Sequence, residues 1–351
     1  MNGVSVRKRE IELDLLRILA LLAVISVHCT GMGNTDAMSM SDPAKRLLVF
    51  FDSIVTWQIP VYVMISGRFF LDPDRMVTKQ RLLKATGRIA IAFIVWNIVY
   101  QLYYIVSGTY SGLNWKGIIS EIFIGPYHFW FLFMIIGLYA VTPFLRKIAA
   151  DKKLSKYYIA LFFAFECLYG YGVSIPGVGG IISDILDKTS FHFALGYSGY
   201  YVLGYYLHKH DISKRCERCL YCLAAILIVL TSGATIYRSV LDEANNEVFT
   251  GYLKPNIIII ACGIYTFFVK RMSRVCFSEK WTHLIEKLSE YSFGVYLLHA
   301  LLIELLNSAG VSPTLITPLI MQPLIMMLVF AITNVAVGLI RGIPGIGKKI
   351  T

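Results

Sequence analysis

The chain has 351 residues, of which 56% are hydrophobic and only 16% are charged, and its mean hydropathy is +0.63. A soluble domain carries about 25% charged residues, so the composition excludes an ordinary water-soluble fold and favours a bundle of membrane-spanning helices. The net charge of +11 does not indicate nucleic-acid binding, because the basic residues stand in short stretches between apolar runs, as in cytoplasmic loops that face anionic lipid.

Apolar runs predict the spanning helices, since each helix needs about 20 mostly apolar residues. Such runs occur at 13–32, 47–71, 89–106, 127–145, 157–173, 191–207, 219–236, 255–269, 292–308 and 316–340. The first run contains Asp14 and Arg17, and no small-residue cleavage site follows it, so we expect a retained helix and no signal peptide. We therefore expect an all-α polytopic membrane bundle of about ten helices, forming a single domain over 1–351 with no separate soluble domain.

The basic residues predict the orientation of this bundle. If the N-terminus is cytoplasmic, most of the 33 lysines and arginines fall in the inner segments and few in the outer loops. Only Arg17 and Arg68 lie inside predicted helices. The positive-inside rule predicts this bias for an even number of spans with both termini inside, so we expect both termini in the cytoplasm.

Seven cysteines give no disulfide framework. Cys216, Cys219 and Cys222 have a spacing that could hold a metal ion, but no second pair of the kind found in structural zinc sites follows them. Other cysteines stand inside apolar runs, where a buried cysteine acts as a small hydrophobe. We therefore expect no metal site.

Ionisable residues inside the predicted spans are functional candidates, because each costs at least a few kcal/mol within the hydrocarbon layer. Arg17 and His28 return to nearly the same face of one helix, about 16 Å apart along its axis. Arg17 and Arg68 both fall near the cytoplasmic end, where guanidinium groups suit the phosphates of a cytosolic molecule. His28 lies deeper, where a neutral histidine suits a general base that accepts a proton from a hydroxyl. Further candidates at mid-depth or toward the outside are Asp52, His128, Glu166, His192 and Glu304.

Each candidate also has a structural explanation. Arg17 could extend to the inner headgroups and pair with Asp14, and His28 could be a hydrogen-bonded interior histidine. The deeper carboxylates could cap loops or bond tyrosines, and a structural role is favoured for His128 and His192. Trp130 fits an aromatic belt at the membrane interface. These alternatives stay open on the residues alone.

Four segments together resemble a known family. The run ELDLLRILALLAVISVH (12–28) resembles the first helix of the membrane acyltransferase-3 family, in which an arginine, ten residues and a histidine form the most characteristic motif. Three further segments resemble the other signatures in family order: IPVYVMISGRFFL (59–71), PYHFWFLFMIIGLYAVTPFLR (126–146) and SEYSFGVYLLHALLIE (289–304), the last including Tyr296 and His299.

The resemblance implies a bacterial enzyme that moves an acyl group, usually acetyl, from cytosolic acyl-coenzyme A to a hydroxyl of a surface sugar or lipid-linked glycan. It implies that His28 is the catalytic base and that Arg17 is an essential donor-site residue. Arg68 departs from the family pattern after Ser-Gly, and we expect it to add a contact to the acyl-CoA phosphates.

The remaining expectations concern the surroundings of His28. We expect Asp52 or Glu166 to take part in catalysis by orienting His28, and His128 and Trp130 to contact the substrate. Acyl-CoA is then a co-substrate, and no cofactor is bound permanently. The other partners are the glycan acceptor and membrane lipids, with the chain spanning the plasma membrane several times and binding no nucleic acid.

Two other classes of protein remain as alternatives. The resembled family includes the membrane half of certain vancomycin-resistance serine racemases, so a small-molecule, serine-like transporter is the first alternative. A transporter should show pseudo-symmetric halves, and we find none in the sequence. The second alternative is a flippase or scaffold for a lipid-linked glycan, in which His28 would be dispensable.

Overall fold

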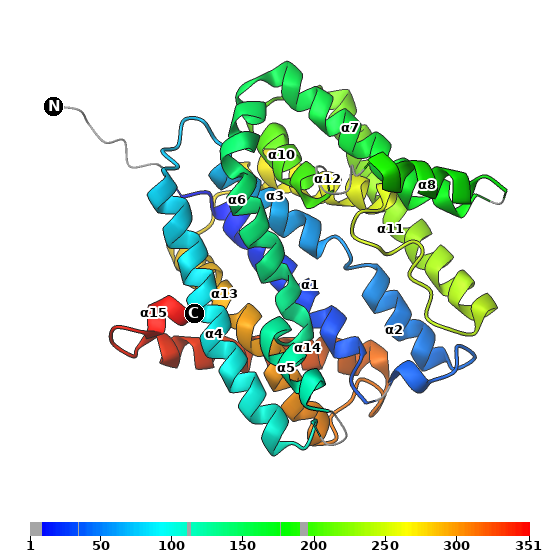
Figure 1. The fold of residues 1–351 in the computed structure, drawn as a ribbon, viewed down its shortest axis with the longest axis vertical. Coiled ribbons are helices and arrows are strands. Elements are labelled where there is room, and N and C mark those ends of the chain that lie inside the picture. The colour runs from blue at the N-terminus through cyan, green and yellow to red at the C-terminus, as the bar shows by residue number, and fades with distance from the viewer. Residues whose placement is uncertain (1–8, 34, 111–113, 176, 190–195) are drawn as a thin grey trace.

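The computed structural model describes residues 9–33, 35–110, 114–175, 177–189 and 196–351. Within these ranges it contains helices and no strands (Figure 1). The α-helices are α1 (Ile11–Thr30), α2 (Pro43–Ser53), α3 (Gln58–Phe70), α4 (Lys79–Val106), α5 (Trp115–Ile124), α6 (Trp130–Ala150), α7 (Lys152–Gly170), α8 (Gly179–Thr189), α10 (Gly196–Lys209), α11 (Lys214–Asp242), α12 (Pro255–Lys270), α13 (Glu279–Ser308), α14 (Pro318–Arg341) and α15 (Gly347–Ile350). Short 3-10 helices are η1 (Thr35–Ala37), η2 (Tyr127–Phe129), η3 (Gly172–Ser174) and η4 (Met272–Arg274).

Seven segments of the described chain are long and apolar enough to cross a membrane. They are Ile11–Thr30, Pro43–Phe70, Lys79–Val106, Tyr127–Ala150, Lys214–Asp242, Pro255–Arg274 and Pro318–Arg341. The three other predicted spans are also helical where described, in α7, α10 and α13, but they do not meet this test. The described part of α10 has 14 residues, and α7 begins with a lysine-rich turn. The all-helical membrane bundle is therefore confirmed, whereas ten spans and cytoplasmic termini stay predictions.

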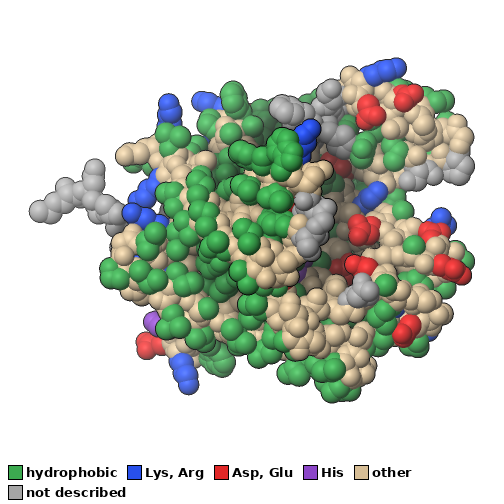
Figure 2. All heavy atoms as spheres, turned by 60° about the horizontal axis from the view of Figure 1, so that its bottom comes forward, with side chains coloured by type: hydrophobic (Ala, Val, Ile, Leu, Met, Phe, Trp, Pro, Cys, Tyr) green, Lys and Arg blue, Asp and Glu red, His purple; other side chains and the backbone are tan. Residues whose placement is uncertain are grey.

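The outer surface of several helices is apolar. Large side chains that are more than half exposed include Phe144 on α6, Val229 and Leu230 on α11, and Leu339 on α14. Figure 2 shows hydrophobic side chains over much of one face of the molecule. A soluble protein rarely exposes contiguous apolar surface of this extent, so we assign these faces to contact with lipid hydrocarbon.

Helix α1 runs through the middle of the bundle (Figure 1). It packs against α2, α3, α12, α13 and α14, and Leu13, Leu16, Leu21 and Ile25 on it are fully buried. Because helices surround α1, its polar side chains face protein and cavities instead of lipid. The carboxyl-bearing residue Asp14 is only 6% exposed, as expected for an ionisable group that the bundle must shield and pair.

The run at 47–71, which predicts one helix, forms two helices in the structure, α2 and α3. Two side chains hold the turn between them: Thr56 Oγ1 donates to the carbonyl of Ser53 (3.1 Å), and Trp57 Nε1 donates to the carbonyl of Ile54 (3.0 Å). Such bonds offer carbonyl groups an alternative to the helical ladder. The break lets α2 leave the line of α3 and form one wall of a cavity beside α1.

Candidate functional site

The polar residues near the N-terminal end of α1 form one hydrogen-bonded cluster with α13. Arg17 Nη1 donates to Asp14 Oδ1 (3.0 Å) and to Ser289 Oγ (2.7 Å). The Ser289 hydroxyl donates to Asp14 Oδ1 (2.6 Å), and Arg9 Nε donates to Asp14 Oδ2 (2.6 Å). The pair between Asp14 and Arg17 is therefore present, and the cluster fixes the Arg17 guanidinium group at the edge of two cavities.

The larger of these two cavities, here called the arginine cavity, has a volume of about 600 Å³. Its charged lining residues are Arg9, Glu10, Asp14, Arg17 and Arg75. The second, here called the apolar slot, has a volume of about 320 Å³ and continues along α1 to Val24 and Tyr296. The two cavities adjoin, because both are lined by Arg17, Ser66, Phe70 and Tyr139. A cationic chamber thus leads into a mostly apolar one.

Arg68, which we expected to contact phosphate, is held by carboxylates. Its Nη2 and Nε donate to the two Glu10 oxygens (2.9 and 3.2 Å), and its Nη1 donates to Asp72 Oδ2 (2.7 Å). Arg75 pairs with the same two carboxylates, at 2.9 Å from Glu10 and 3.4 Å from Asp72. The two arginines differ in that Arg75 lines the arginine cavity and Arg68 does not. The proposed phosphate contact of Arg68 stays a prediction. Arg9, Arg75 and Arg88, which fall outside the predicted spans, line the two cavities.

Three histidines from distant parts of the chain meet beyond the slot. His28 of α1, His128 of η2 and His299 of α13 have ring centroids 5.1 to 6.3 Å apart. The ring of Tyr127 lies against that of His28, with centroids 5.1 Å apart. The Tyr296 hydroxyl donates to the carbonyl of His128. No group of three or more His, Cys, Asp or Glu in the described part of the chain could hold a metal ion.

Two members of this histidine cluster are buried with unpartnered ring nitrogens. His128 is 2% exposed and His299 is 0% exposed. Neither nitrogen of His128 has a hydrogen-bond partner among the described residues, nor has Nε2 of His299. The other nitrogen of His299, Nδ1, lies 2.6 Å from the carbonyl oxygen of Tyr296. Buried polar atoms without partners are costly and uncommon in folded proteins, so these nitrogens call for a functional explanation.

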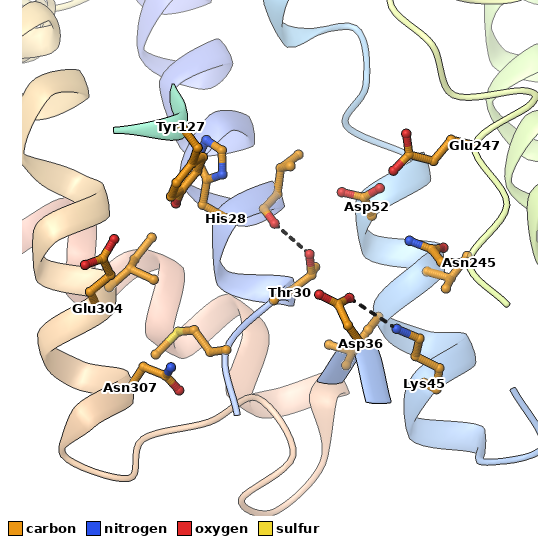
Figure 3. Close-up of a pocket in the computed structure, with 16 residues that line it drawn as sticks. His28, Thr30, Asp36, Lys45, Asp52, Tyr127, Asn245, Glu247, Glu304 and Asn307 are labelled. Carbon is orange, nitrogen blue, oxygen red and sulfur yellow. Dashed lines mark hydrogen bonds and ion pairs between the residues drawn. The ribbon is translucent and has the colours of Figure 1, made fainter. Parts of the chain in front are cut away.

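A third cavity, here called the histidine cavity, lies at the C-terminal end of α1 and has a volume of about 380 Å³ (Figure 3). His28 and Tyr127 line it, together with Glu304 and Asn307 of α13. Its opposite wall carries Asp36, Lys45, Asp52, Asn245 and Glu247. Lys45 is already held there by the Thr35 carbonyl (2.9 Å) and Asp36 (3.6 Å). This cavity is wide and polar, as a binding site for a sugar would need to be.

Among the expected orienters of His28, Asp52 lines the histidine cavity but lies across it from His28 (Figure 3). Glu166, 1% exposed on α7, does not line that cavity and has one unpartnered oxygen. Its charged neighbour is Lys254: burial lowers the pKa of the Lys254 ammonium group, and the Glu166 carboxylate opposes that shift. Neither residue is brought to His28, and their catalytic roles stay predictions.

The expected substrate contacts also separate in space. His128 belongs to the histidine cluster. Trp130 is 40% exposed and stacks on Tyr252, with ring centroids 6.0 Å apart, and its ring centroid lies 5.8 Å from that of Tyr197. Such an aromatic surface could pack against a sugar ring, but Trp130 does not line the histidine cavity. His192 lies outside the described residues.

The arrangement separates two kinds of chemistry along one helix. Cationic side chains at the N-terminal end of α1 can bind phosphate oxygens, and His28 at the other end can accept a proton within a polar cavity. The fold and the site define a multi-pass membrane protein in which the central helix α1 carries Arg17 at an arginine-lined chamber and His28 at a cluster of three histidines.

Comparison with known proteins gives the family. The family model described as "Acyltransferase domain" matches residues 10–340, and the chain belongs to this membrane acyltransferase-3 family. Curated relatives named "Probable poly-beta-1,6-N-acetyl-D-glucosamine export protein" come from Staphylococcus aureus strains MSSA476 and MW2, at 22% identity, and Mu50 / ATCC 700699, at 23%. Each match covers 85% of this chain and 83% of the relative. No solved structure matches the chain.

Proposed function

We propose that this protein is a plasma-membrane acyltransferase that moves an acyl group, most simply acetyl, from cytosolic acyl-coenzyme A to a hydroxyl of an extracytoplasmic glycan or lipid-linked sugar. One observation carries the proposal: Arg17 borders the arginine cavity and the apolar slot at one end of α1, and His28 lines a polar cavity at the other end. The membership of the acyltransferase-3 family supports it.

The donor occupies the arginine cavity and the slot. Arg9, Arg17 and Arg75 supply guanidinium groups for the phosphates of coenzyme A, because the planar fork matches phosphate oxygens. The slot takes the thioester arm. His28 lies eleven positions after Arg17 on the helix, which corresponds to about 16 Å along the axis. This distance suits an extended arm that reaches the histidine cluster.

The acceptor occupies the histidine cavity, and His28 acts as its general base. His28 takes the proton of the acceptor hydroxyl, the oxygen attacks the thioester carbonyl, and the carbon–sulfur bond breaks. The proton then passes to the thiolate of coenzyme A, so that the free thiol leaves and the ester remains. An N–H of His128 can donate to the carbonyl oxygen as negative charge develops on it.

The test is acyl transfer by the purified full-length chain in detergent. Radiolabelled acetyl-CoA is supplied, and labelled acetate and labelled glycan are measured for the wild type, His28→Ala and Arg17→Ala. Removal of a general base costs about 10²–10⁴-fold in rate, so His28→Ala should abolish transfer while donor binding survives. Arg17→Ala should weaken donor binding. A wild type that neither binds nor cleaves the donor would rule the proposal out.

A second candidate function is export of a hexosamine polymer, because the S. aureus relatives are named as probable poly-beta-1,6-N-acetyl-D-glucosamine export proteins. An exporter needs a path for the polymer and has no need of a base, so His28→Ala should leave export intact. The same variant therefore separates the two candidates when surface glycan is measured in cells beside acetyl transfer. Uptake of serine into proteoliposomes tests the transporter alternative in the same preparation.

A further inference from the structure

A histidine that acts as a base needs a partner for its second nitrogen. In serine hydrolases a carboxylate fixes the tautomer of the base and stabilises the imidazolium ion that forms. We expected Asp52 or Glu166 in this role here, but Asp52 lies across the histidine cavity and Glu166 does not line it (Figure 3). The side chains whose rings lie against His28 are Tyr127, His128 and His299.

The hydrogen bond that His299 already makes defines its tautomer. Its Nδ1 lies 2.6 Å from the backbone carbonyl of Tyr296, and a carbonyl oxygen can only accept. The proton therefore sits on Nδ1, and Nε2 of the neutral ring carries a lone pair. That Nε2 is buried and has no partner among the described residues. His299 thus presents a fixed, unused acceptor inside the protein.

The spacing of the rings brings this acceptor to His28. Two imidazoles joined by a hydrogen bond between nitrogens have ring centroids about 5 Å apart, since the bond itself spans about 3 Å. The centroids of His28 and His299 are 5.2 Å apart, with an angle of 36° between the ring planes. The bond requires a rotation of the His28 ring, and His128, whose ring centroid lies 5.1 Å from that of His299, is the other imidazole at a similar distance.

We infer that His299 is the positioning residue of His28, in a histidine–histidine pair that replaces the histidine–carboxylate pair of serine hydrolases. This inference rests on the proposed function. His28 donates its N–H to Nε2 of His299, which leaves the other His28 nitrogen unprotonated toward the acceptor hydroxyl. When that nitrogen takes the hydroxyl proton, His28 becomes an imidazolium ion that Nε2 stabilises, and the proton then goes to the departing thiolate.

The competing explanation is structural: His299 holds the backbone of α13 through the Tyr296 carbonyl and does nothing for His28. Two amide variants separate these explanations. Asparagine places a donor near the position of Nδ1, so His299→Asn can keep the bond to Tyr296 but has no atom at Nε2. Glutamine reaches the position of Nε2, so His299→Gln keeps an acceptor for His28 and gives up the Nδ1 bond.

The experiment measures kcat and the donor KM for acetyl transfer, beside the thermal midpoint of each purified protein. We expect His299→Asn to lower kcat by at least about 10²-fold with donor KM unchanged, and His299→Gln to keep far more activity. His283→Asn is the matched control, since His283 is exposed on the same helix and should behave as wild type.

The outcomes distinguish failure of this inference from failure of the proposed function. If His28→Ala is inactive while His299→Asn is as active as the wild type or more active than His299→Gln, His299 is structural and the inference is wrong, but the acyltransferase proposal stands. If His28→Ala keeps full activity, the proposed base is wrong, and the His299 inference falls with it. Equal thermal midpoints for the two amide variants establish that their difference in kcat is chemical.

Discussion

Replacing Arg17 by alanine tests the donor site with little disturbance of the fold. The substitution removes two hydrogen bonds of Arg17 Nη1, to Asp14 (3.0 Å) and to Ser289 (2.7 Å). Asp14 nevertheless keeps two partners, because Arg9 Nε and the Ser289 hydroxyl each donate to it at 2.6 Å. Loss of a buried arginine usually destabilises a protein because it leaves a buried carboxylate unpaired. Arg17→Ala does not leave Asp14 in that state.

The two consequences of Arg17→Ala differ in size. The Arg17 side chain is 25% exposed, and a partly solvated ion pair is worth about 1 kcal/mol or less, so the free energy of unfolding should fall only slightly. A hydrogen bond between a guanidinium group and a phosphate is worth about 1.5–3 kcal/mol. The dissociation constant of acetyl-CoA should therefore rise about 10- to 150-fold.

The assay is equilibrium binding of radiolabelled acetyl-CoA to the detergent-purified chain, with the thermal midpoint measured on the same sample. Arg17→Lys should recover part of the affinity, since lysine keeps the charge but loses the fork geometry. Arg238→Ala is the control, because Arg238 is exposed and pairs only locally with Asp242 at 3.1 Å. An unchanged dissociation constant for Arg17→Ala in a folded protein would refute the assignment of the arginine cavity to the donor.

Three further predictions, one of them with a matched control substitution, have distinct expected results. Arg68→Ala should lower the free energy of unfolding by about 1–3 kcal/mol, since Glu10 and Asp72 each lose one partner and keep Arg75, at 2.9 and 3.4 Å. It should change donor affinity less than Arg17→Ala, and weak binding by a variant with unchanged thermal midpoint would instead give Arg68 the phosphate contact. Gly204→Ala on α10 should destabilise the protein by about 1–3 kcal/mol, because its new Cβ would lie 2.2 Å from the carbonyl oxygen of Met64 on α3. Gly233→Ala is the control: its Cβ would meet nothing within 4 Å, so the thermal midpoint should stay unchanged or rise. Asp52→Asn should leave kcat within a few-fold of the wild type, and a drop of 10²-fold or more would restore Asp52 as the orienter of His28.

Part of this site could be predicted because it lies on one helix. The apolar run around Arg17 and His28 defines α1, and helical periodicity alone puts the two residues on one face. The pairing of Arg17 with Asp14, three residues earlier, is equally local. The apolar run could not predict that Ser289 of α13 bonds Asp14, because this contact depends on how α13 packs against α1.

Helix boundaries were predicted less well where polar side chains act on the backbone. The run at 47–71 is apolar enough for one span, yet Thr56 and Trp57 bond nearby carbonyls and end the first helix. Hydropathy averages over such a turn and does not detect it. Elsewhere charge extends a helix beyond its apolar run, as in α4, which begins at Lys79, ten residues before the predicted start at 89.

The histidine pair shows why the catalytic partner lies beyond the reach of sequence reasoning. His299 meets His28 because α13 packs along α1, and a residue on a third helix fixes the local backbone of α13. Tyr100 of α4 donates to the carbonyl of Leu297 (3.0 Å) and accepts from the amide of Leu301 (2.8 Å), so it holds α13 on both sides of His299. Asp52 or Glu166 was the expected partner of His28, because a charged residue inside an apolar run stands out in a sequence. The position of His299 depends instead on Tyr100, an uncharged residue about 200 positions earlier in the chain. The role of Tyr100 follows from its two hydrogen bonds to α13, and no pattern along the sequence indicates it.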